Sequence, residues 1–202
     1  MSDPPISAEQ VKRLREATGA GMMDCKKALQ EAGGDTEKAK DILRERGLAS
    51  FQKRQGRSAT QGLVDAYIHG EGRIGVLVEV NCETDFVART DEFKRLAREV
   101  AMQVAATNPR WVSRDQVPEE VIASERKIYE EQARLSGRPE NVWERMVLGK
   151  LEAYFKVEVL LDQPYVRDDS RTIGDLVKEV GAKVGENVAV RRFARFRLGE
   201  EV

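Results

Sequence analysis

The sequence predicts an α+β fold, in which helices pack on one face of a small, mainly antiparallel sheet. Residues 73–80 place isoleucine and valine at alternate positions, which is the period of a strand. Residues 91–107 carry apolar side chains at the spacing of one helix face, and residues 187–198 alternate again like a strand. A hairpin, several helices and a closing strand therefore follow a helical N-terminal segment.

The composition is that of a soluble protein without a global charge bias. Hydrophobic residues make up 41% of the chain, and 34 basic side chains face 35 acidic ones, which leaves a net charge of −1. This balance favours neither nucleic acid nor an anionic membrane as a partner. No apolar run approaches the roughly 18 residues that span a bilayer. Residues 1–5 do not resemble a signal peptide, so we expect a cytoplasmic protein with free thiols at Cys25 and Cys82.

The chain lacks the usual side chains of catalysis. His69 is the single histidine, which excludes a pair of histidine ligands for zinc and leaves no ordinary histidine triad. We expect His69 to be an exposed residue at a turn. No phosphate-binding loop of the G-x-x-x-x-G-K-[ST] type is present. The sequence therefore predicts a protein that is not an enzyme and that uses no metal and no cofactor.

Residues 1–47 predict a docking module of three short helices. A capping box that begins at Ser7 starts the first helix. The second helix is expected over residues 22–32, between glycine-rich turns. Asp35 is a suitable N-cap for the third helix, and Gly47 is a suitable C-cap.

Two adjacent methionines, Met22 and Met23, begin the second helix. Neighbouring residues point about 100° apart on a helix, so both cannot lie at the centre of one buried face. Met22 has the spacing of the apolar face that continues at Cys25 and Leu29. One interpretation places one methionine in the core and the other at its edge. The alternative is that they form an adaptable contact surface for a partner.

Residues 48–61 are polar and basic, and they predict a linker to a core domain that spans residues 62–202. We favour solvated side chains over a phosphate site for Lys53, Arg54 and Arg57. In the core, a hairpin of residues 63–69 and 73–80 turns at a Gly-Glu-Gly sequence. Helices are expected over residues 90–107, 118–135, 139–157 and 172–184, with an apolar stripe in the second of these that includes Ile128 and Leu135.

The closing strand, residues 187–198, carries arginines among apolar residues. Its alternation predicts one inward face that consists of Val188, Val190, Ala194, Phe196 and Leu198, with Arg192 at the same parity. Arg191, Phe193, Arg195 and Arg197 are expected on the outer face. A charged face that protects an edge strand is the favoured interpretation. Binding of RNA, with a steep dependence on salt, is the alternative.

The loop between the hairpin and the first core helix combines capping residues with an aromatic one. Thr84 or Asp85 is expected to cap a short turn that contains Phe86 and Val87. Periodicity alone favours a Phe86 ring that points inward. A small-molecule enzyme that uses Glu83 and Asp85 is a further alternative, but two carboxylates without other oxygen donors make a poor metal site.

Two segments resemble signatures of the bacterial elongation factor Ts family. Residues 18–29 read TGAGMMDCKKAL and are similar to its N-terminal signature, and residues 80–88 read VNCETDFVA and are similar to its second signature. Residues 163–166 and 185–188 resemble later blocks of the family. Because these segments occur in order over nearly the whole chain, it is identified as a short member with a single core subdomain.

The resemblance implies an N-terminal module of the ubiquitin-associated type that docks on the nucleotide-binding domain of elongation factor Tu. It also implies that Thr84, Asp85, Phe86 and Val87 press into that domain. The Phe86 ring would wedge in near the Mg²⁺ site and promote release of GDP. It further implies that Met22 and Met23 contact the same partner.

Longer family members carry a second, similar core subdomain, which this chain has no room for. We therefore expect a homodimer, in which a second copy takes that place. An intersubunit disulfide at Cys82 is the alternative to a free thiol.

Overall fold

The computed structural model describes residues 6–200, so the N-terminal pentapeptide lies outside the described residues. The chain forms two compact units. The first consists of the residues up to 62 together with residues 81–90 and 177–189, and the second contains the rest. The chain combines helices with a small sheet, which confirms the predicted α+β class. Within residues 6–200, no helix combines the length and the apolarity needed to cross a bilayer.

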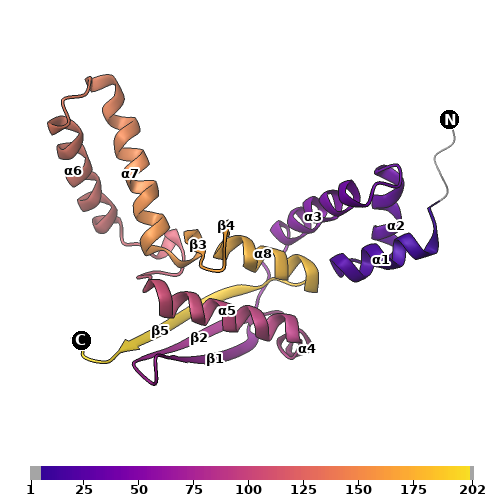
Figure 1. Ribbon diagram of the computed structural model, residues 1–202. Helices are drawn as coiled ribbons and strands as arrows, with labels where there is room; N and C mark the ends of the chain where they lie inside the picture. Colours follow the sequence, from indigo (N-terminus) through magenta and orange to yellow (C-terminus); the bar gives the residue numbers. More distant parts are fainter. Residues whose placement is uncertain (1–5, 201–202) are drawn as a thin grey trace. The chain divides into compact units, whose positions relative to one another are not determined.

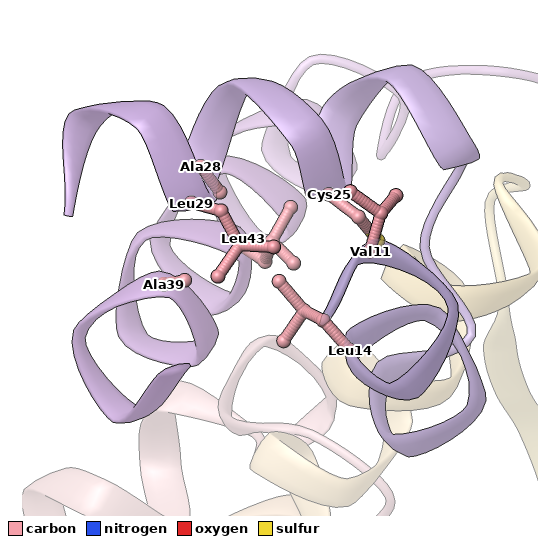
Figure 2. Close-up of a cluster of buried hydrophobic side chains, with 7 residues drawn as sticks. All are labelled: Val11, Leu14, Cys25, Ala28, Leu29, Ala39 and Leu43. Atoms are coloured by element: carbon pink, nitrogen blue, oxygen red, sulfur yellow. The ribbon is translucent and has the colours of Figure 1, made fainter. Parts of the chain in front are cut away.

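Three helices open the first unit: α1 (Ala8–Thr18), α2 (Met22–Glu31) and α3 (Thr36–Gln52). The predicted capping box is present at Ser7, and the Asp35 side chain accepts hydrogen bonds from two backbone N–H groups of α3. The helices share one apolar core. Its side chains point toward one another from all three helices (Figure 2), and they are Val11, Leu14, Cys25, Ala28, Leu29, Ala39 and Leu43.

Helix α3 does not end at Gly47, as the sequence predicted, but continues to Gln52. The glycine serves close packing instead of a C-cap. A Cβ atom added at Gly47 would lie 3.1 Å from the Cβ atom of Ala182, which belongs to α8 (Ile173–Val184). Near this contact, Arg44 pairs with Glu179 at 3.7 Å. The end of α3 is therefore fixed against the second half of α8.

The sheet has the strand order β1-β2-β5, with β1 (Gln61–His69), β2 (Ile74–Cys82) and β5 (Ala189–Arg197). The predicted hairpin is confirmed, and His69 is exposed at its turn. Helix α5 (Asp91–Thr107) lies along one face of the sheet (Figure 1). On this face, Arg98 pairs with Asp65 of β1 and donates to the carbonyl oxygen of Ala66. The apolar positions predicted for α5 are buried: Phe93, Leu96, Ala97, Val100, Ala101 and Val104.

The predicted faces of the closing strand are only partly correct. Val188 and Val190 are buried, but Phe196 and Leu198 are 69% and 78% exposed. Arg191 and Arg192 are two consecutive exposed residues, and they interrupt the alternation of burial along β5. An irregularity of one residue moves every later side chain to the opposite face.

The predicted faces of the arginines and Phe193 change accordingly. Arg195, expected outside, has a side chain that is only 8% exposed and pairs with Glu200, and Phe193 is partly buried. Arg192 donates to Glu79 at 2.7 Å.

Helices α6 (Glu119–Leu135) and α7 (Trp143–Glu158) pair as a hairpin in the second unit (Figure 1). Ile128 and Leu135 are 47% and 72% exposed, so the predicted stripe of α6 is wrong at these positions. The hairpin core consists of Val117, Ala133, Val147, Leu151, Phe155 and Val159. A short hairpin of β3 (Pro164–Tyr165) and β4 (Asp168–Thr172) follows, which the sequence did not predict, and brief 3₁₀ turns cover Arg114–Gln116, Glu140–Val142 and Leu160–Asp162.

Candidate partner-binding site

The loop after β2 folds into a single helical turn, α4 (Asp85–Ala88). Thr84 is its N-cap, as predicted, since its hydroxyl accepts a hydrogen bond from the Val87 N–H at 3.4 Å. Ala88 is buried and fixes the inner side of the turn. The turn is therefore a short element with one anchored side and one open side.

Phe86 lies on the open side of this turn, where its side chain is 79% exposed. The prediction of an inward ring is thus wrong. The physical reason is the helical spacing: Phe86 precedes the buried Ala88 by two residues, which places the two side chains about 200° apart. A ring of this size in water has no stabilising role in the monomer, so it is the first candidate for a contact with a partner.

The carboxylates beside Phe86 are engaged within the chain. Asp85 pairs with Arg89 at 2.7 Å. The Glu83 carboxylate accepts a hydrogen bond from the Asn187 backbone N–H at 2.7 Å and lies 3.5 Å from the Arg57 guanidinium. Both acids therefore have structural partners, which does not favour the alternative of an enzyme site built on them.

A third carboxylate, that of Glu186, binds the start of the turn. It accepts hydrogen bonds from the backbone N–H groups of Glu83 and Thr84, both at 3.0 Å, and from the Thr84 hydroxyl at 2.6 Å. Reasoning from the residues alone gave Glu186 no role. Its position in the Gly-Glu-Asn-Val segment, which resembles a family block, was the one signal available. Local sequence pattern does not reveal a contact between residues about a hundred positions apart.

Cys82 ends β2 directly below the turn, and it is buried and free. Its thiol donates to the Thr84 carbonyl oxygen at 3.1 Å. Burial raises the pKa of Cys82 to about 11, and the negative charge of Glu186 acts in the same direction. A thiol that is buried and protonated is poorly placed for a disulfide between subunits.

Met22 and Met23 form the second exposed apolar group of the first unit. Their side chains are 47% and 63% exposed, so neither fills the core. Cys25 and Leu29 occupy the inward face of α2, and Ala20 packs against the core at the end where Met22 was expected. The interpretation with one buried methionine is therefore wrong, and both side chains are available for contact.

The chain is similar to known proteins over most of its length. A family model described as Elongation factor TS matches residues 37–200. A protein named Elongation factor Ts from Coprothermobacter proteolyticus is 60% identical over 96% of this chain and 99% of its own length. Proteins of the same name from Thermoanaerobacter sp. (strain X514) and Carboxydothermus hydrogenoformans are 59% and 60% identical, over 98% and 96% of this chain and 97% and 90% of their lengths. The chain therefore belongs to the elongation factor Ts family.

Proposed function

We propose that the chain releases GDP from elongation factor Tu by inserting Phe86 beside the nucleotide and its Mg²⁺ ion. Members of this family are translation elongation factors and act as nucleotide exchange factors for elongation factor Tu. In the proposed mechanism the chain acts by binding and makes or breaks no covalent bond. It needs no nucleic acid for this step, and it works in the cytoplasm, where translation takes place.

The observation that carries the proposal is the exposure of Phe86 on a fixed turn. Its ring is 79% exposed, while Thr84 caps the turn and Ala88 anchors it. An aromatic side chain has few rotatable bonds, so it fills a pocket on a partner at a small cost in entropy. Because the backbone below it is already ordered, little further order is lost when it binds.

Exchange then follows from linkage between two binding equilibria. A factor that binds the nucleotide-free GTPase more tightly than the GDP form weakens the affinity for GDP by the same ratio. A wedge that disturbs the contacts of Mg²⁺ and phosphate has this preference, since it fits only where those contacts are absent. Thr84, Asp85 and Val87 hold the wedge at its place in this mechanism.

The N-terminal module is proposed to supply docking affinity. Residues 1–47 would bind the nucleotide-binding domain through Met22 and Met23, whose unbranched, polarisable side chains adapt to a partner surface. Residues 48–61 then connect this module to a core of residues 62–202. Docking and wedging are separate tasks in this proposal, so they can be disrupted separately.

The experiment is the release of a fluorescent GDP analogue from elongation factor Tu. Loss of a hot-spot side chain costs about 2 kcal/mol or more, so Phe86→Ala should release the nucleotide at least about 30-fold more slowly than wild type. Leu135→Ala is the matched control, because Leu135 is 72% exposed, close to the value for Phe86, but lies on α6. Equal rates for wild type and Phe86→Ala would exclude the wedge, and a wild type without effect would exclude exchange.

We also propose that the chain forms a homodimer through the open face of its sheet, which we define by Val64, Ile68, Leu77, Phe196 and Leu198. These side chains are between 48% and 78% exposed. An apolar area of this kind on one face of a sheet is typical of a surface that is covered in the assembled protein.

These five side chains lie on the same side of the sheet. Ile68 lies over Gly75, since a Cβ atom there would be 3.4 Å from the Ile68 Cδ1 atom. Gly75, Leu77 and Glu79 share one parity on β2. The ion pair of Glu79 with Arg192 places the even-numbered side chains of this part of β5, Phe196 and Leu198 among them, on that same side.

A second copy is the partner that fits this face. It supplies an identical apolar surface, and two sheets pack readily face to face. In a two-fold arrangement each patch meets itself, so the Glu79–Arg192 pairs add no net charge to the contact.

A further inference from the structure

We infer that Glu186 is a positioning residue for the Phe86 wedge, acting through Thr84 and the backbone of the α4 turn. The inference rests on the proposed function, because it concerns how the wedge is held. Glu186 does not touch the partner in this account. Its role is to fix the direction in which Phe86 leaves the surface.

The Glu186 carboxylate is the common acceptor for the residues that begin the turn. Two backbone N–H groups and one hydroxyl converge on it, within 2.6 to 3.0 Å. Hydrogen bonds to a charged acceptor are roughly twice as strong as neutral ones. Three of them restrain the backbone at Glu83 and Thr84, immediately before Phe86.

Glu186 also determines how Thr84 caps the turn. A hydroxyl group has one proton to donate, and Thr84 donates it to Glu186. Its lone pairs are then free to accept the Val87 N–H, which closes the turn around Phe86. The hydrogen bonds therefore run from Val87 to Thr84 and from Thr84 to Glu186. Phe86 lies in the sequence between the two residues that the first of these bonds joins.

The restraint is reciprocal and reaches the segment after α3. Glu83 accepts the backbone N–H of Asn187, while Glu186 accepts the backbone N–H of Glu83. The Asn187 side chain is buried and donates to the carbonyl oxygens of Gln55 and Arg57, at 3.3 and 2.8 Å. Glu83 and Glu186, together with Asn187, thus connect the turn that carries Phe86 to the end of α8 and to the segment after α3.

An uncharged substitute cannot reproduce this arrangement. In Glu186→Gln one carboxylate oxygen is replaced by an NH₂ group, which is itself a donor. The one remaining oxygen can still face the two backbone N–H groups, which share one carboxylate oxygen in the wild type, but they lose a charged acceptor. The NH₂ group then faces the Thr84 hydroxyl, which has no acceptor left for its proton. The variant has nearly the same volume, so it tests the hydrogen bonds and not the packing.

The first measurement is amide hydrogen exchange of the isolated protein. In Glu186→Gln, the protection of the Glu83 and Thr84 amides should fall by about 10-fold or more, the loss expected for a bond to a charged acceptor. Thr84→Val removes the hydroxyl donor from the other side of the same bond and should also lower protection at Val87. Glu131→Gln, a carboxylate that pairs with Arg134 on α6, should change none of these amides.

The second measurement is GDP release from elongation factor Tu, with Glu186→Gln in two backgrounds. A positioning role requires release to fall about 10-fold or more when Phe86 is present and to stay unchanged when Phe86 is already alanine, because contacts that act through one residue are not additive. Thr84→Val should behave in the same way. Equal losses in both backgrounds would indicate a merely structural role and overturn the inference.

The outcomes separate the inference from the function on which it rests. Normal release by wild type, together with no effect of Glu186→Gln on either release or protection, overturns the positioning role alone. Absence of release by a folded wild type overturns the exchange function and the positioning role with it. Loss of protection without loss of release shows a restrained turn that exchange does not need, and also overturns the inference.

Discussion

The ring of Phe51 occupies the space that a side chain at Gly181 would need. A Cβ atom at residue 181 would lie 2.2 Å from the Phe51 Cε2 atom and 3.1 Å from the Glu186 carbonyl oxygen. Phe51 is only 2% exposed, so its ring has little freedom to move away. This contact joins α3 to α8 inside the unit that carries the candidate site.

We therefore expect Gly181→Ala to destabilise the protein. An extra methyl group in a packed contact of this kind typically costs about 1–3 kcal/mol, although alanine is the better helix former. Urea unfolding followed by circular dichroism measures the change in the free energy of unfolding.

Gly149→Ala is the matched control for this substitution. Gly149 lies in α7, and a Cβ atom there would meet nothing within 4 Å. The alanine should therefore raise the free energy of unfolding, by about 0.5–1 kcal/mol. If both variants gained stability, the contact between Phe51 and residue 181 would be looser than the geometry implies.

The buried thiol of Cys82 predicts a loss of stability at high pH. Its pKa is raised from 9.0 to about 11, mainly by burial. The unfolded chain loses this proton near pH 9, whereas the folded protein keeps it until about pH 11. The contribution of the protonated Cys82 thiol to the free energy of unfolding is thus complete below pH 9 and is lost as the pH rises through about 11. The free energy of unfolding, measured with urea between pH 8 and 11, should fall less steeply with pH for Cys82→Ala than for wild type.

The same burial predicts the reactivity of the thiol. Cys82 in the native protein should resist iodoacetamide at pH 8 and react once the protein is unfolded, because only an accessible thiolate is alkylated. Mass spectrometry of the peptide that contains Cys82 distinguishes it from Cys25. Rapid alkylation of native Cys82 would contradict the buried position of the residue.

Elements with a strong local signal were predictable from the sequence. The apolar side of α5 repeats over four turns, and the alternation of β2 is regular, so their buried faces follow from periodicity alone. The caps at Ser7, Asp35 and Thr84 were also predictable, since a capping bond is made within three residues.

Features that depend on distant contacts were not predictable. Gly47 has the pattern of a C-cap, but a glycine is needed there because the helix packs closely against Ala182, which is far away in the sequence. The direction of Phe86 depends on which side of a four-residue turn is anchored, and such a turn is too short to show a period. The faces of β5 change at Arg191 and Arg192, an irregularity that alternation counts cannot detect.

The exposed Met23 predicts a variant that weakens docking without changing the fold. Met23→Glu places a charge on a side chain that is 63% exposed, so the free energy of unfolding should change little. Affinity for elongation factor Tu should fall about 10-fold, the usual loss for an important interface side chain. Titration calorimetry measures the affinity, and GDP release at saturating concentration should keep its wild-type rate. Unchanged affinity would remove Met23 from the docking surface.

The open face of the sheet predicts that a single charge separates the dimer. Leu77→Arg introduces a cation on β2, the central strand of the sheet, where a second copy would bury it without a partner. An unpaired buried charge costs several kcal/mol, which is enough to dissociate a dimer at micromolar concentration. The monomer should stay folded, because residue 77 is 48% exposed in the single chain.

Sedimentation equilibrium measures this change. A concentration of about 10 μM is suitable, because a dimer with a micromolar dissociation constant is mostly assembled there. Wild type should sediment as a dimer and Leu77→Arg as a monomer, while circular dichroism verifies that both are folded. Leu135→Arg is the control, since Leu135 is exposed on α6 and does not belong to the open face. A monomeric wild type would overturn the homodimer. A dimeric Leu77→Arg would place the contact elsewhere, because two copies packed through this face have no water at its centre to solvate the added cation.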